Sequence, residues 1–257
     1  MNRADTLAVL DRRARFPRGL AQPEGGYRFS LDSLLLACFA RPGRRNVGAD
    51  LGCGCGVVGL GLLLRQPGLA LTGVELDPAA ADAALANADA LHFQEKFQVV
   101  RADVADWRPE RVLDFVVANP PYRRLGAGRV SRGEERATAR FEGRGEFARF
   151  ARCAALALKT RGKFSFVHLP ERLAGLLADL ARTGLEPKRL RMVHARPGEE
   201  ARMVLVEAVK AARPGLRAEP PLILHRGTGK QTRLTDEALA FCPFLGCNRG
   251  EPEGEER

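Results

Sequence analysis

A glycine-rich turn between an apolar run and a helix-like stretch constrains the fold of this chain most. Val47-Gly-Ala-Asp-Leu51 is short and apolar, as expected for a buried strand, and residues 57–64 are apolar enough for a packed helix. Between them lie three alternate glycines, Gly52, Gly54 and Gly56. Glycine lets the backbone turn sharply and approach a ligand closely, beside the free N–H groups of a helix N-terminus. The segment therefore predicts the first strand, turn and helix of an α/β fold that binds a nucleotide-like ligand.

Two further strands each lead to a carboxylate. The spacing Gly-x-Gly-x-Gly departs from the dinucleotide pattern Gly-x-Gly-x-x-Gly, so the turn alone is weak evidence. The run 70–74 ends at Glu75, 23 residues after Gly52, where an acidic side chain can accept from both ribose hydroxyls. The run 97–100 leads to Asp103, which is placed to meet the amino group of an adenine. With Asp50 before the turn, these residues predict an adenosyl cofactor site.

A tetrapeptide after a fourth apolar run indicates the chemistry. Asn119-Pro120-Pro121-Tyr122 follows the run Phe-Val-Val-Ala directly. The Asn119 side chain and the Pro120 carbonyl can accept both hydrogens of a planar nitrogen, which frees its lone pair for a methyl group. The two prolines fix φ, so the acceptors are preorganised, and Tyr122 offers a face on which an extruded base can stack. We therefore expect methylation of a planar nitrogen by S-adenosylmethionine; a rigid loop without a catalytic role is the alternative.

With these motifs, the chain resembles the class I S-adenosylmethionine-dependent methyltransferases that carry Asn-Pro-Pro-Tyr. More narrowly, it is similar to the bacterial tRNA1(Val) adenine-37 N6-methyltransferase family. The narrower resemblance rests on four stretches outside the core motifs, residues 26–37, 134–142, 203–210 and 220–224. Together with the motifs it covers about residues 20 to 240.

The resemblance implies a Rossmann-like α/β fold with a seven-stranded, mostly parallel sheet and a final antiparallel strand. The implied reaction is N6-methylation of adenine 37 in the anticodon loop of tRNA1(Val). Phe29 and Asp32 would lie near the methionine end of the cofactor, and Asn119 would contact the cofactor as well as the target base. An ordinary strand followed by an amphipathic helix is the alternative for residues 27–37.

The charge of the chain favours a polyanionic partner. The 257 residues carry a formal net charge of +10 and a pI near 9.9, although an arginine-rich composition also arises from a GC-rich genome. Nine arginines but only four glutamates lie between Tyr122 and Arg152. We expect six of them to contact tRNA phosphates: Arg123, Arg124, Arg129, Arg132, Arg136 and Arg140. A solvated charged loop beside the active site is the alternative.

Cysteine spacing and hydropathy indicate an enzyme of the cytoplasm without a metal. Cys242 and Cys247 have a Cys-x4-Cys spacing, but no matching Cys or His pair lies near them in the sequence. No stretch approaches the ~18 apolar residues of a membrane span, and the N-terminus lacks the features of a signal peptide. In a reducing compartment the cysteines would remain thiols.

Strands and helices alternate along the chain as a parallel sheet requires. Residues 185–195 and 201–209 predict two strands joined by the turn Arg-Pro-Gly-Glu-Glu, which favours a hairpin. We expect one domain over residues 1–248, with an N-terminal extension (1–46), a Rossmann-like core (47–212), a C-terminal appendage (213–248) and a disordered tail (249–257).

Two other functions share parts of this pattern. Release-factor glutamine N5-methyltransferases also use Asn-Pro-Pro-Tyr on a planar amide, but they carry a helical domain before the cofactor turn, and 46 residues precede Val47 here. A non-catalytic RNA-binding module on the same fold is the second alternative, although it would need no cofactor residues. The sequence leaves the oligomeric state open.

Overall fold

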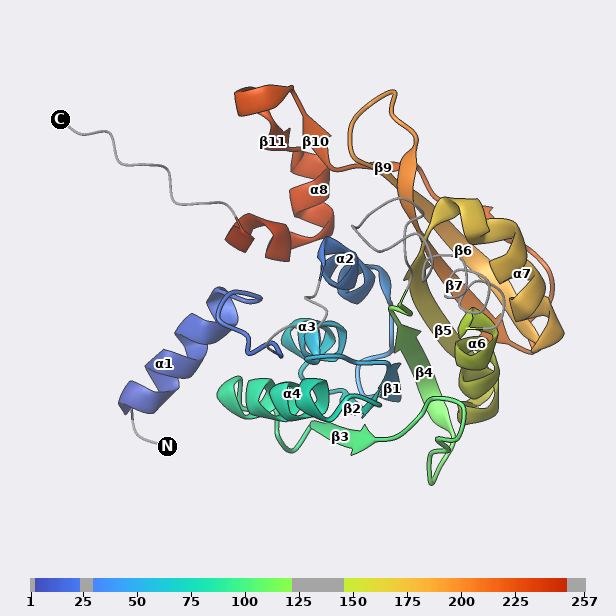
Figure 1. The fold of residues 1–257 in the computed structure, drawn as a ribbon, viewed down its shortest axis with the longest axis horizontal. Helices are drawn as coiled ribbons and strands as arrows, with labels where there is room; N and C mark the ends of the chain where they lie inside the picture. The colour runs from blue at the N-terminus through green and yellow to red at the C-terminus, as the bar shows by residue number, and fades with distance from the viewer. Residues whose placement is uncertain (1–2, 24–29, 122–145, 249–257) are drawn as a thin grey trace, which may run out of the picture.

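The computed structural model describes residues 3–23, 30–121 and 146–248. There the chain forms a large twisted sheet with helices on both faces (Figure 1). Its strands are β1 (Val47–Leu51), β2 (Ala70–Glu75), β3 (Phe97–Arg101), β4 (Leu113–Ala118), β5 (Leu158–His168), β6 (Leu185–His194), β7 (Ala201–Lys210), β8 (Arg217–Ala218) and β9 (Leu222–Ile223). A separate hairpin pairs β10 (His225–Arg226) with β11 (Arg233–Leu234).

The α-helices are α1 (Arg3–Ala14), α2 (Leu31–Phe39), α3 (Val57–Arg65), α4 (Pro78–Ala90), α6 (Glu146–Ala157), α7 (Leu173–Arg182) and α8 (Asp236–Phe241). Three short 3-10 helices are η1 (Pro170–Arg172), η2 (Gly229–Gln231) and η3 (Pro243–Asn248). Side-chain capping explains where two of the helices begin. Asp77 accepts from the Ala79 N–H to cap α4, and Thr235 accepts from the Ala238 N–H to cap α8.

The strand order is β3-β2-β1-β4-β5-β7-β6, with β8 and β9 both paired to β6. Neighbours from β3 to β5 are parallel, while β7 runs antiparallel to both β5 and β6. The predicted seven-stranded, mostly parallel sheet with a final antiparallel strand is therefore confirmed, and the hairpin expected near residues 196–200 joins β6 to β7. The two-residue strands β8 and β9 extend the sheet beyond the prediction.

Two hydrophobic cores cover the two faces of the sheet. Along β4, Phe115 and Val117 enter the core formed with α2, α3 and α4, whereas Val116 and Ala118 enter the core formed with α6 and α7. Side chains alternate across a strand, so a strand covered by helices on both faces needs apolar residues at every position. This explains why the run before Asn119 is apolar without alternation.

The parallel arrangement gathers the carboxyl ends of several strands at one edge of the sheet. β1 lies between β2 and β4, with Leu51 paired to both Val74 and Ala118. The segments that follow these strands therefore begin side by side, which is where α/β sheets bind ligands. This edge is referred to below as the catalytic edge.

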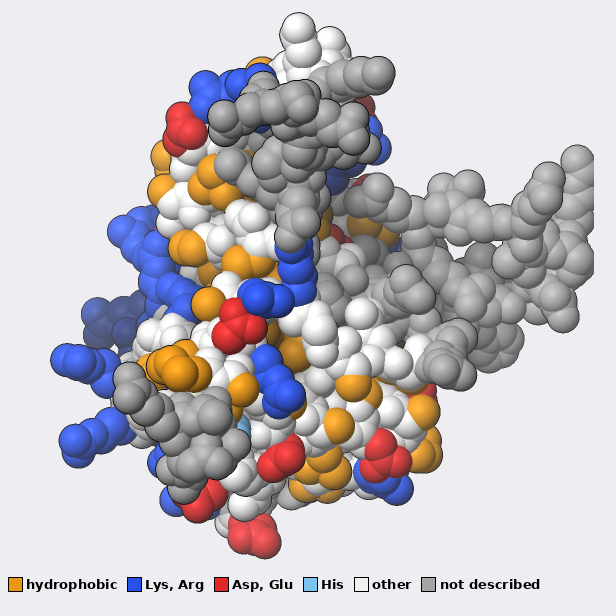
Figure 2. All heavy atoms as spheres, turned by 90° about the vertical axis from the view of Figure 1, so that its left-hand side faces the viewer, with side chains coloured by type: hydrophobic (Ala, Val, Ile, Leu, Met, Phe, Trp, Pro, Cys, Tyr) orange, Lys and Arg blue, Asp and Glu red, His pale blue; other side chains and the backbone are white. Residues whose placement is uncertain are grey.

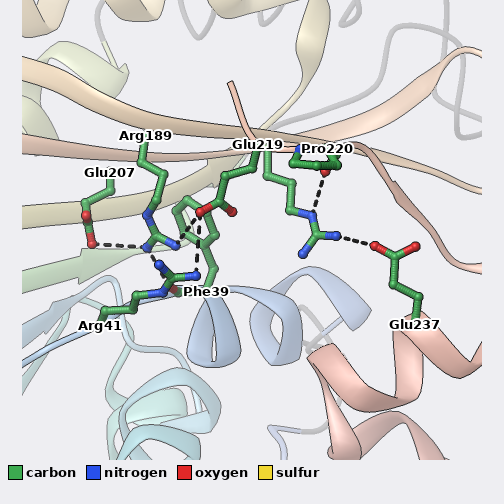
Figure 3. Close-up of polar contacts among 8 residues, drawn as sticks. Phe39, Arg41, Arg189, Glu207, Glu219, Pro220 and Glu237 are labelled. Atoms are coloured by element: carbon green, nitrogen blue, oxygen red, sulfur yellow. Dashed lines mark hydrogen bonds and ion pairs between the residues drawn. The ribbon is translucent and has the colours of Figure 1, made fainter. Parts of the chain in front are cut away.

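Helix α2 lies against α3 and is buried on all sides, from Asp32 to Phe39. A helix without a polar face must be covered all round, and the amphipathic alternative for this stretch is therefore wrong in the part that the structure describes. The C-terminal end of α2 is held by a polar network around Arg189 (Figure 3). Arg189 is 2% exposed, and its guanidinium donates to the Phe39 carbonyl at 2.7 Å and lies 3.8 Å from the centre of the Phe39 ring.

Two carboxylates neutralise this buried guanidinium. Arg189 pairs with Glu207 of β7 at 3.2 Å and with Glu219 at 3.3 Å, and Arg41 reaches the same Glu219 at 3.5 Å (Figure 3). A buried charge is tolerated only when it is paired and hydrogen-bonded, so the network fixes where α2 ends relative to β6 and β7. Its energetic value for stability is modest, but its geometric effect is to hold α2 in one place.

Candidate active site

The glycine turn after β1 leaves an open side. Gly52, Gly54 and Gly56 have φ of 64°, 54° and 86°, which side chains other than glycine rarely adopt. The N–H groups of Gly52 and Cys53 donate to the Val74 carbonyl at 2.8 and 3.1 Å, so the turn bends over the end of β2. A Cβ built on Gly54 would meet no atom within 4 Å. The turn therefore leaves space for a ligand to approach the backbone closely at Gly54.

Glu75, at the end of β2, is held by the backbone. One carboxylate oxygen accepts from the Gly54 N–H at 2.8 Å, and the other accepts from the N–H groups of Leu76 and Asp77, both at 2.9 Å. A carboxylate offers about four acceptor positions, so Oε2 keeps one open for a ribose hydroxyl. The next side chain, Leu76, is 66% exposed and adds an apolar surface beside this carboxylate.

Asp50 is a buried carboxyl group beneath the turn. It is 1% exposed, and its Oδ2 accepts from the Gly59 N–H of α3 at 2.9 Å, while its Oδ1 has no hydrogen-bond partner among the described residues. Burial raises the pKa of Asp50 to about 7, and the charge of Glu75 acts in the same direction. A cationic ligand group near Oδ1 would favour the ionised form.

Asp103, after β3, is paired with a helix that follows the catalytic motif in sequence. Its Oδ1 accepts from the Ala105 N–H at 2.8 Å, and both of its oxygens lie 2.6 Å from a guanidinium nitrogen of Arg149 in α6. The Ala105 N–H and then Arg149 hold the pKa of Asp103 below its ordinary value. The sequence placed Arg149 only within an arginine-rich segment, so this ion pair is an addition to the predicted site.

Asn119 follows β4 directly, on the other side of the glycine turn from Glu75. Its Nδ2 donates to Ser33 Oγ of α2 at 3.0 Å. Its Oδ1 is buried and has no hydrogen-bond partner in the described part of the chain. Buried polar atoms normally have partners, so this oxygen is a candidate acceptor for a ligand N–H. Pro120 is buried and Pro121 is exposed.

Along the catalytic edge, the strand order places the segments that carry these four residues in the sequence Asp103, Glu75, Asp50 and Asn119. Asp32, which is 8% exposed, precedes Ser33 in the first turn of α2. Phe29, Tyr122 and the six arginines expected to bind RNA lie outside the described residues. The structure thus brings together the predicted groups that it describes, and their roles as site residues stay predictions.

The residues present fit an adenosyl cofactor. Glu75 is fixed with accepting capacity to spare, Gly54 is open on the side where a Cβ would stand, and Asp50 has a buried oxygen that lacks a partner among the described residues. Asn87 of α4 ties the N-terminal extension to this turn, because its amide donates to the carbonyls of Ala21 and Cys55, both at 2.9 Å. The extension therefore belongs to the framework of the site.

His168 is a further residue at this edge. It ends β5 beside β4, and its Nδ1 accepts from the Leu169 N–H at 2.8 Å, so Nε2 carries the proton. Burial lowers the pKa of His168 to about 4, and the charge of Arg172 adds to the effect, which makes this a neutral ring at pH 7. The sequence Lys163-Phe-Ser-Phe-Val-His168 is largely apolar and ends at this histidine, so looking for polar residues at strand ends could have found it.

The described residues contain no group of three or more His, Cys, Asp and Glu side chains that could hold a metal. Cys242 and Cys247 are free thiols that contact different segments: Cys242 donates to the Leu34 carbonyl, and Cys247 to that of Ala14. In the same part of the chain, no helix is long and apolar enough to cross a membrane.

Residues 31–170, more than half of the chain, match the family model described as the methyltransferase small domain. The chain belongs to this methyltransferase family. The fold, the methyltransferase activity and S-adenosylmethionine as the cofactor, all predicted from the sequence, are thereby confirmed.

Curated relatives and a solved structure agree with this placement. A tRNA1(Val) (adenine(37)-N6)-methyltransferase of Porphyromonas gingivalis is 29% identical over 227 residues, which cover 81% of this chain and 87% of that protein. A relative of the same name from Aliivibrio salmonicida is 28% identical over 142 residues, only 60% of its length. Atu636 of Agrobacterium tumefaciens, described as a predicted O-methyltransferase, superposes with a TM-score of 0.67 at 25% identity over 83% of this chain and 96% of its own. These curated relatives confirm the resemblance to the tRNA1(Val) adenine-37 N6-methyltransferases that was drawn from the sequence.

Proposed function

We propose that the protein transfers the methyl group of S-adenosylmethionine to the N6 amino group of an adenine in tRNA, specifically adenine 37 in the anticodon loop of tRNA1(Val). The observation that carries this proposal is the Asn119 amide. Its oxygen is buried without a partner among the described residues while its nitrogen is bonded to Ser33, directly beside the glycine turn. The shared name of the curated relatives supports the choice of substrate.

On the cofactor side, the chain's residues bind and orient. Glu75 accepts from the ribose hydroxyls, Asp103 from the adenine amino group, and the glycine turn presents its backbone at Gly54. Asp50 and Asp32 would contact the methionine end of the bound molecule, and so would Phe29, which lies outside the described residues. When bound there, S-adenosylmethionine supplies an activated methyl group.

On the substrate side, Asn119 Oδ1 and the Pro120 carbonyl accept the two N–H groups of the target nitrogen. An amino group on adenine shares its lone pair with the ring and is a weak nucleophile. Two fixed acceptors hold the nitrogen closer to tetrahedral geometry, which makes the lone pair available. No strong base is required, because the nitrogen is cationic once it has accepted the methyl group, and its acidic proton can then pass to water.

Tyr122 and the arginines after it complete the proposal on the RNA side. Tyr122 stacks on the extruded base, and Arg123, Arg124, Arg129, Arg132, Arg136 and Arg140 contact phosphates. On the face of the molecule shown in Figure 2, Lys and Arg side chains gather along the left side of the view and lie elsewhere among acidic and apolar ones. We also propose a cytoplasmic location and a single catalytic domain over residues 1–248.

The test uses tRNA from a strain that lacks the gene. Nucleosides from its purified tRNA1(Val) are analysed by mass spectrometry, with and without plasmids that restore the wild-type protein or Asn119→Ala. The proposal predicts that N6-methyladenosine is absent in the deletion strain, returns with the wild type and does not return with Asn119→Ala. Unchanged N6-methyladenosine in the deletion strain would overturn the proposed function, and loss of methylglutamine from release factors would favour the protein substrate instead.

A further inference from the structure

We propose that Ser33 is a positioning residue for methyl transfer. Its hydroxyl accepts from Nδ2 of the Asn119 amide, which fixes the plane of the amide and leaves Oδ1 to accept from the amino group being methylated. The inference rests on the proposed function for its chemistry and assigns to Ser33 a role that the sequence motifs do not contain. Ser33 acts through Asn119 and need not touch substrate or cofactor.

The contact itself is specific. Asn119 Nδ2 donates to Ser33 Oγ at 3.0 Å, between residues 86 positions apart, and Ser33 is 6% exposed. On the opposite side of the same amide, Oδ1 is buried and has no partner among the described residues. One end of the amide is thus bonded within the protein, and the acceptor end remains for a ligand.

An asparagine amide can rotate by half a turn, which exchanges its oxygen and its nitrogen. In the rotated state two N–H donors, those of Asn119 and of the target amino group, would face each other. Such a pair repels, and the target nitrogen would lose the acceptor that frees its lone pair. The reaction therefore needs an acceptor on the protein side of Asn119. A serine hydroxyl can donate as well as accept, and here Ser33 Oγ accepts, so the hydroxyl and the bound amino group together favour the productive orientation.

Ser33 stands on a rigid element. Helix α2 is buried from Asp32 to Phe39, Arg189 and Arg65 donate to the Phe39 and Ala37 carbonyls at 2.7 and 2.6 Å, and the Ser33 N–H donates to the Ser30 carbonyl at 3.1 Å. A functional group is held accurately when its supporting residue lies on a packed helix rather than on a loop. The buried α2 thus has a function at the catalytic edge: it fixes the amide that ends β4.

A double-mutant cycle separates positioning from simple packing. Ser33→Ala should lower kcat on the order of tenfold, with the KM for S-adenosylmethionine unchanged. In the Asn119→Ala background the same change should have no further effect, because the group it positions is gone. Ser33→Cys keeps the size but is a weak acceptor, so it should show the same loss. Ser165→Ala, which removes another buried serine hydroxyl from β5, is the matched control and should leave kcat unchanged.

A second readout does not depend on the methyl acceptor. In protein labelled with 15N at asparagine, the side-chain signal of Asn119 is identified by its loss in Asn119→Ala. In Ser33→Ala this signal should shift and its hydrogens should exchange faster. An unmoved signal would overturn the positioning role whatever the substrate, and so would an equal loss of kcat in both backgrounds. A wild-type protein that methylates no adenine would instead overturn the proposed function.

Discussion

The two sides of the glycine turn hold their functional groups in different ways. On the cofactor side, Glu75 is fixed by three backbone N–H groups from its own strand end and from the turn. On the substrate side, Asn119 is fixed by one side chain, Ser33, from a helix 86 positions earlier in the sequence. The cofactor carboxylate is thus a local product of the strand–turn–helix unit, whereas the orientation of the Asn119 amide is a product of tertiary packing.

This contrast predicts how each side responds to change. Backbone N–H groups cannot be removed by a side-chain substitution, so the cofactor side should tolerate changes at its neighbours. The substrate side depends on single side chains and should lose turnover while cofactor affinity persists. The predictions that follow are ordered from the largest expected effect to the smallest.

The sharpest separation is expected at Asn119. Asn119→Ala should lower kcat on the order of 10²-fold or more, because one preorganised acceptor for the reacting nitrogen is removed. Affinity for S-adenosylhomocysteine should stay within a few-fold of the wild type, as calorimetry can show. If Asn119 only stabilises the loop, the variant would instead melt at a lower temperature and keep near-normal turnover.

On the other side of the turn, Glu75→Gln should weaken S-adenosylhomocysteine about ten- to a hundredfold. A carboxylate that accepts from both ribose hydroxyls contributes roughly 1.5–3 kcal/mol, and an amide supplies one acceptor fewer. Asp77→Asn is the matched control, since asparagine also caps a helix well and the site keeps its carboxylate. Equal affinities of Glu75→Gln and the wild type would remove Glu75 from the ribose site.

The expected stacking residue tests whether the substrate side also depends on shape. Tyr122→Ala should lose roughly 1–3 kcal/mol of interaction with the target base, while Tyr122→Phe and Tyr122→Trp should keep most activity. Steady-state kinetics with a tRNA anticodon stem-loop measures both. Loss of activity in Tyr122→Phe would show that the hydroxyl of Tyr122 is required and would contradict a stacking role for its ring.

The smallest effect per residue is expected in the arginine segment. Replacing Arg129, Arg132 and Arg136 together should raise the KM for tRNA and flatten its salt dependence, by about 0.7 in the logarithmic slope for each phosphate that is no longer neutralised. Cofactor affinity should not change. A control triple removes the same charge from exposed Arg44, Arg45 and Arg111, which precede β1 and β4 at the opposite edge of the sheet. Equal slopes for the two triple variants would move the RNA surface away from the segment after Tyr122.

Much of this architecture could be predicted from the sequence, because it is encoded locally. The glycine turn, the strands that end near Glu75, Asp103 and Asn119, and the β6–β7 hairpin each follow from a short pattern. The seven-stranded, mostly parallel sheet with a final antiparallel strand was implied by the family resemblance and is confirmed by the fold.

What escaped prediction depends on contacts between distant segments. No sequence pattern predicts that Ser33 contacts Asn119 or that Asp103 pairs with Arg149. The strands β8 and β9 have two residues each, too few for any periodic pattern, and exist because β6 offers them a free edge. The exposure of Leu76 could not be predicted for another reason: the sequence alone does not distinguish an exposed leucine from a buried one.

The central claim is tested most directly by determining which atom of the RNA receives the methyl group. Purified protein is incubated with an unmodified tRNA1(Val) transcript and S-adenosylmethionine that carries a deuterated methyl group, and the RNA is cleaved and mapped by mass spectrometry. The account predicts labelled N6-methyladenosine at adenine 37 with the wild type, and none with Asn119→Ala although that variant still binds S-adenosylhomocysteine. Label on another nucleotide or another atom, or equal labelling by Asn119→Ala, would contradict it.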